Sequence, residues 1–149
     1  MSTRTKAIVV TVAVAIPAFL LVGVFFPPPS GPGPSSGQLP FFVVLSALDS
    51  LLLGVGVAFV AFGWNMARRV APASRARWLA IYVALAWLMV SWYPHIGLHT
   101  SNFSGILVID YVFHLPLFIA PLLLIWGFLG LLHDRPIGVT EGKHPMSAR

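Results

Sequence analysis

Three histidines and two aspartates are the residues of this chain whose types and spacing favour metal chemistry. His95 and His99 are four residues apart, Asp110 and His114 are also four apart, and Asp49 is embedded in an apolar stretch. Imidazole and carboxylate are ligands that copper, zinc and iron accept, whereas calcium and magnesium prefer sites made of oxygen. A spacing of four places two side chains on one face of a helix. The pattern therefore predicts a transition-metal site, with copper or zinc as the first candidates.

The sulfur-containing residues limit which kinds of metal site the chain can form. The chain has no cysteine, so thiolate ligands, disulfides and covalently attached c-type haem are excluded. Its methionines, among them Met66, Met89 and Met146, do not accompany the histidines, which disfavours a Cu(I) carrier. Asp110 has two possible roles: it is either a ligand itself or the acceptor of the ring N–H of His114.

Two alternatives to a metal site remain open at the level of sequence. Asp49 and Asp110 both lie near helix ends, so the five residues also suit a wetted or hydrogen-bonded cluster at the membrane surface. A b-type haem is the second alternative, and it requires facing histidines from two helices. The first three apolar stretches contain no histidine, so one haem ligand would have to come from a loop.

The elements that position these residues are expected to be membrane-spanning helices. Of the 149 residues, 58% are hydrophobic and 9% charged, against the roughly 25% charged residues of a soluble domain. The apolar stretches 7–26, 41–66, 78–93 and 106–132 approach or exceed the roughly 20 residues that cross a bilayer. We expect a single membrane domain over 1–149, an all-α integral membrane four-helix bundle built from two antiparallel transmembrane hairpins.

The positions of the basic residues predict how these helices are oriented. All nine Lys and Arg residues fall in the N-terminus, the connection 67–77 and the tail 133–149, whereas the loops 27–40 and 94–105 contain none. Short loops rich in Lys and Arg remain cytoplasmic, so both termini should lie in the cytoplasm. We expect the membrane to be the plasma membrane. The net charge of +5 then records topology and contact with lipid, without a role in nucleic-acid binding.

This topology places His95 and His99 in the outer loop 94–105, directly before the helix that carries Asp110 and His114. Gly97 lies between the two histidines and argues against a helix there. Asp49 is near the outer end of its own helix. The five candidate residues are therefore expected at one end of the bundle, facing outward.

A line of small side chains on the second helix predicts close helix packing. Ser46, Ser50, Gly54 and Ala58 recur every four residues, and such faces let helix backbones approach closely in lipid. The partner is either another helix of this chain or another subunit, including a second copy of the chain.

The function that these features favour is that of a small metal-binding subunit or accessory of a membrane redox or metal-handling complex. A chain of 149 residues with a single shallow site fits an accessory role better than that of a free-standing enzyme. A glycine-rich phosphate loop and a nucleophile elbow are both missing from the sequence. A structural or assembly subunit without a cofactor, and a haem-binding subunit, are the alternatives.

Overall fold

The described part of the chain is entirely helical. The structure, a computed structural model, describes residues 1–28, 30–31, 33–70, 74–101 and 107–134, apart from the side chains of Val70, Leu107, Ile109, Asp110, Leu131, His133 and Asp134. These residues form the helices α1 (Thr3–Leu20), α2 (Val22–Phe25), α3 (Leu39–Phe62), α4 (Trp64–Val70), α5 (Arg75–His99) and α6 (Leu107–Asp134). No strand occurs among them, which confirms the predicted all-α class.

Four of the described helices are long and apolar enough to cross a membrane. They are Thr3–Leu20, Leu39–Phe62, Arg75–His99 and the Tyr111–Gly130 part of α6. Many of their large apolar side chains are exposed, including Ile16, Val44 and Phe118. Such surfaces suit lipid and would be unfavourable in water. The four helices confirm the predicted number of candidate spans and fit a multi-pass membrane protein.

Several helix boundaries differ from the predicted ones. The predicted helix 7–26 is divided between α1 and α2 at Leu21, and the predicted helix 41–66 is divided between α3 and α4 at Gly63. The largest difference is in α5, which extends beyond the predicted 78–93 at both ends. At its start the Ser74 side chain accepts a hydrogen bond from the Arg77 N–H, a typical N-cap that lets the helix begin at Arg75.

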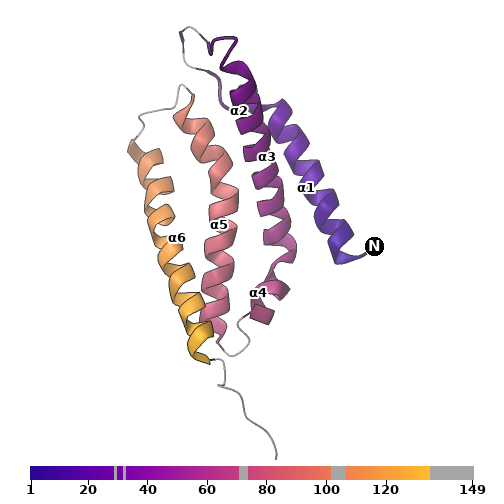
Figure 1. The fold of residues 1–149 in the computed structure, drawn as a ribbon, viewed down its shortest axis with the longest axis vertical. Coiled ribbons are helices and arrows are strands. Elements are labelled where there is room, and N and C mark those ends of the chain that lie inside the picture. Colours follow the sequence, from indigo (N-terminus) through magenta and orange to yellow (C-terminus); the bar gives the residue numbers. More distant parts are fainter. Residues whose placement is uncertain (29, 32, 71–73, 102–106, 135–149) are drawn as a thin grey trace, which may run out of the picture.

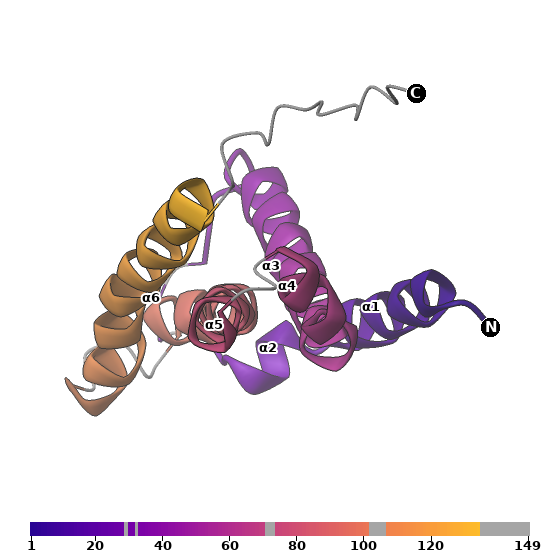
Figure 2. The same ribbon diagram turned by 90° about the horizontal axis from the view of Figure 1, so that it is seen from below.

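The four long helices lie side by side in a row, as Figure 1 shows. Each runs antiparallel to the one before it, and α3 packs against α1 and α5 while α5 packs against α6. Seen from below in Figure 2, α1 and α6 are at opposite ends of the row. The four-helix bundle arrangement predicted from the sequence is therefore not confirmed.

The small side chains of α3 pack against helices of the same chain. A Cβ atom at Gly54 would overlap with the Thr11 carbonyl oxygen of α1 and approach the Ala15 Cβ to 3.1 Å. On another side of α3, a Cβ at Gly56 would approach the Met89 Cβ of α5 to 2.9 Å. The face formed by Ser46, Ser50, Gly54 and Ala58 is therefore covered by α1 around Gly54. At Gly54 the neighbour is thus a helix of the same chain, which was one of the two partners considered from the sequence, and self-association through the rest of this face stays a prediction.

Candidate metal centre

His95 and His99 lie on the last turns of α5, so their predicted position in an outer loop was wrong. The helix continues through Pro94 and Gly97 and ends at His99. Proline is tolerated within membrane helices. At the end of α5, the Thr100 hydroxyl donates to the Ile96 carbonyl over 2.9 Å and the Ser101 hydroxyl to the Leu98 carbonyl over 3.1 Å. The same two carbonyl groups also accept backbone N–H bonds, from Thr100 to Ile96 over 3.0 Å and from Ser101 to Leu98 over 3.4 Å, so side-chain and backbone donors together close this end of the helix.

Gly97 allows the chain after α2 to pack closely on this end of α5. A Cβ atom at Gly97 would overlap with the Phe26 ring, which also meets the Tyr93 ring edge to face with centroids 5.5 Å apart. The Tyr93 hydroxyl donates a 2.6 Å hydrogen bond to the Ala18 carbonyl. Figure 2 shows α2 beside α5. Contacts with Phe26 and Ala18 thus hold the end of α5 that carries the two histidines.

The three histidines near this end converge on one point. His95 and His99 come from α5, and His114 comes from α6 across the interface between the two helices. One ring nitrogen from each lies within 4.8 Å of the other two. The Nε2 atoms of His95 and His114 are 3.3 Å apart. Two helices therefore bring together three imidazoles that could hold a single metal ion.

The His95 and His114 nitrogens match the spacing of two ligands on a tetrahedral ion. Nitrogen ligands bind zinc at about 2.0–2.1 Å, and a tetrahedral angle then separates two of them by about 3.3–3.4 Å. The 3.3 Å between the His95 and His114 Nε2 atoms falls in this range. His99 is exposed and the other two side chains are partly buried, so the cluster is accessible from outside the protein.

The same distance does not fit a haem held between these two histidines. Axial nitrogens on opposite sides of an iron, each at about 2 Å, would be about 4 Å apart with the macrocycle between them. The His95 and His114 rings meet edge to face, with centroids only 4.9 Å apart. This geometry leaves no layer for a porphyrin between His95 and His114, so this pair favours a small ion over haem.

Aromatic rings surround His95 and connect it with Asp49. The Phe113 ring stacks on His95 with centroids 5.8 Å apart, and the Trp92 ring meets His95 edge to face at 6.2 Å. The Trp92 indole N–H donates to Asp49 Oδ1 over 2.9 Å. Asp49 is only 5% exposed, so this bond compensates part of the cost of burying its carboxyl group.

The structure places the two predicted aspartates differently. Asp49 is not in the group of converging ligand atoms among the described residues, and its hydrogen bond goes to Trp92. The backbone of Asp110 is in α6, one turn before His114, but its side chain lies outside the described residues. Sequence reasoning missed Trp92 as a neighbour of the site. Its position three residues before His95 was the available signal, since that spacing shares a helix face.

We predict that Trp92→Phe destabilises the protein by about 1–3 kcal/mol. The substitution keeps an aromatic ring beside His95 but removes the donor of Asp49, and a buried acceptor without its donor costs this much. Thermal unfolding in detergent, followed by circular dichroism, measures the loss. Trp126→Phe is the control, because Trp126 is 49% exposed on α6. Equal stability of the two variants would contradict a stabilising role for the bond between Trp92 and Asp49.

Comparisons with protein-family models, with curated proteins and with solved structures found no match. Three imidazoles that converge from two helices can hold an ion and leave one tetrahedral position for a fourth ligand.

Proposed function

We propose that this chain is a multi-pass membrane protein that binds one transition-metal ion, copper or zinc, through His95, His99 and His114. The observation that carries the proposal is the convergence of three imidazoles from α5 and α6, with one Nε2 pair at 3.3 Å. Imidazole suits both ions, and a chain without cysteine offers no thiolate to compete for them.

A carboxylate completes the proposed site. Asp110 precedes His114 by one turn of α6, which suits it to be a fourth ligand or to accept the ring N–H of His114. Asp49 supports the site indirectly, because its partner Trp92 packs against His95. In this proposal Asp49 is a positioning residue and does not bind the ion.

The location of the proposed site follows from the distribution of charge. The end of α5 and the start of α6 are at the top of Figure 1, whereas α4 and the start of α5, with Arg68, Arg69, Arg75 and Arg77, are at the bottom. If the basic end is cytoplasmic, both termini are inside and the histidines face outward from the plasma membrane. A small chain with one shallow site fits a subunit or accessory of a membrane redox or metal-handling complex.

Metal analysis of the purified protein tests this proposal. We expect close to one copper or zinc ion per chain after purification without chelators. Replacement of this ion by Co²⁺ should give the absorption spectrum of tetrahedral Co²⁺. The His133→Ala variant should retain the ion as the parent protein does, because residue 133 is 19 positions beyond His114, or about 28 Å along α6. Protein that neither retains nor takes up an ion, or that carries a haem absorption band, would overturn the proposal.

A second candidate, a structural or assembly subunit without a cofactor, is favoured by one observation. At 3.3 Å one imidazole of the His95 and His114 pair can donate a hydrogen bond to the other, which links α5 to α6 without an ion. If this function is correct, glutamine at both positions should leave the recovery of the chain with its partner subunits unchanged. Added zinc should not change the melting temperature of the protein.

A further inference from the structure

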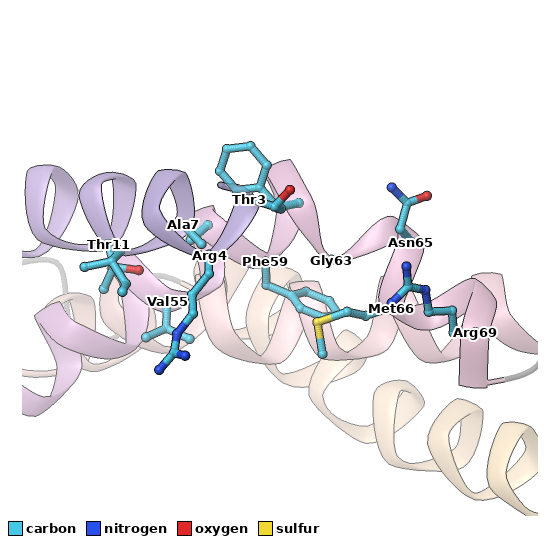
Figure 3. A pocket seen from close by; sticks show the side chains of 13 residues that line it. Thr3, Arg4, Ala7, Thr11, Val55, Phe59, Gly63, Asn65, Met66 and Arg69 are labelled. Carbon is cyan, nitrogen blue, oxygen red and sulfur yellow. The ribbon is translucent and has the colours of Figure 1, made fainter. Parts of the chain in front are cut away.

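A groove unrelated to the histidines runs between the start of α1 and the end of α3 with α4. Figure 3 shows side chains from these three helices around it. Its volume is about 770 Å³, within the range of small-molecule sites. Most of its lining is apolar, and the apolar side chains are Ala7, Ile8, Val55, Ala58, Phe59, Phe62 and Met66.

The same groove carries two arginines on its rim. Arg4 belongs to α1 and Arg69 to α4, and both are exposed. Asp49 is the one acidic side chain that the structure describes, and it is bonded to Trp92 on α5. Within the described residues, therefore, no carboxylate neutralises Arg4 or Arg69. The groove combines an apolar floor with uncompensated positive charge.

The groove also lies where lipid headgroups are expected. The first candidate span begins at Thr3 and the second ends at Phe62, and both residues line the groove. The apolar part of the lining is thus at the edge of the hydrocarbon region, and α4 with Arg69 continues beyond it. Basic pockets between membrane helices at this depth bind the headgroups of anionic lipids.

We propose that this groove is a binding site for one anionic phospholipid. The guanidinium groups of Arg4 and Arg69 interact with the phosphate-bearing headgroup, since planar guanidinium groups match phosphate oxygens. An acyl chain lies along Val55, Ala58 and the α1 side chains that face them. A free phosphate would use only the arginines, whereas the lipid also needs the apolar floor.

Native mass spectrometry of the full-length protein tests the proposal. The protein is released from detergent after incubation with phosphatidylglycerol or with phosphatidylcholine of the same acyl chains. We expect one phosphatidylglycerol to be retained and phosphatidylcholine to be lost. Arg4→Gln with Arg69→Gln should weaken retention about thirtyfold, because each basic residue near a membrane surface contributes about fivefold.

Two further variants distinguish the groove from general surface charge. Lys6→Gln with Arg68→Gln removes the same charge from the same helices, but neither residue lines the groove, so retention should stay within about twofold. Val55→Trp fills the floor from a position that is 41% exposed and should lower retention at least tenfold. Equal retention of the two lipids, an equal loss in both charge variants, or unchanged retention in Val55→Trp would overturn the proposal.

Discussion

His114→Ala should lower the affinity of the purified protein for Zn²⁺ by more than one hundredfold. Among the described side chains, His114 is the one histidine of the converging group that comes from α6, so its removal leaves only the two histidine ligands of α5. Loss of a group that merely orients a ligand already costs about 10–100-fold in metal affinity, and loss of a ligand should exceed this. Competition titration with a chromogenic chelator, in detergent, measures the effect.

Two controls make this result specific to the cluster. His133→Ala removes a histidine from the other end of α6 and should leave the affinity unchanged. His95→Ala combined with His114→Ala should weaken binding little more than either substitution alone, because ligands of one ion act as a unit. An affinity in His114→Ala within threefold of the parent would place the ion elsewhere in the chain and contradict the proposed site.

The ligand types and the candidate spans could be predicted from the sequence. The apolar stretches set the number of membrane-length helices, since each needs about 20 residues. The spacing of four between His95 and His99 already allows both to face one point on a helix. His114 follows from the hairpin, because the end of one helix and the start of the next lie at the same side of the membrane.

The local course of the chain near the site could not be predicted. Pro94 and Gly97 are residues that usually end helices, yet α5 continues to His99. The reasons lie in tertiary structure: the Ser101 side chain is only 1% exposed and its hydroxyl bonds to the Leu98 carbonyl, and Gly97 provides space for the Phe26 ring. These contacts join residues whose proximity no spacing in the sequence indicates.

The order of the helices in the row could not be predicted from the sequence either. A small-residue face on α3 predicts a close neighbour but does not say which helix it is. Gly54 meets Thr11 and Ala15 of α1, whereas Gly56 meets α5. The three histidines are on α5 and α6, so they come from a different pair of helices than the contact of Gly54 with α1. Helices α1 and α3 reach the histidine-bearing end of α5 through the bonds of Ala18 to Tyr93 and of Asp49 to Trp92.

Gly54→Leu should therefore separate α1 from α3 and leave metal binding intact. The nearest group to a side chain at position 54 is the Thr11 carbonyl oxygen, which belongs to the backbone and cannot move to another rotamer. Overpacking of this kind costs about 1–3 kcal/mol, and membrane helices have no hydrophobic driving force to offset it. Affinity for Zn²⁺ should stay within threefold, because neither helix contributes a histidine to the cluster.

A disulfide cross-link between the two helices measures this separation directly. The natural chain has no cysteine, so Ala7→Cys with Ala58→Cys introduces one pair on opposite walls of the groove between α1 and α3. Oxidation should cross-link the parent protein efficiently and the Gly54→Leu variant poorly. Gly23→Leu is the matched control, because a Cβ there meets no atom within 4 Å among the described residues. Undiminished cross-linking in Gly54→Leu would mean that α1 tolerates a large side chain at its closest approach to α3, and the packing of these two helices would then not depend on glycine.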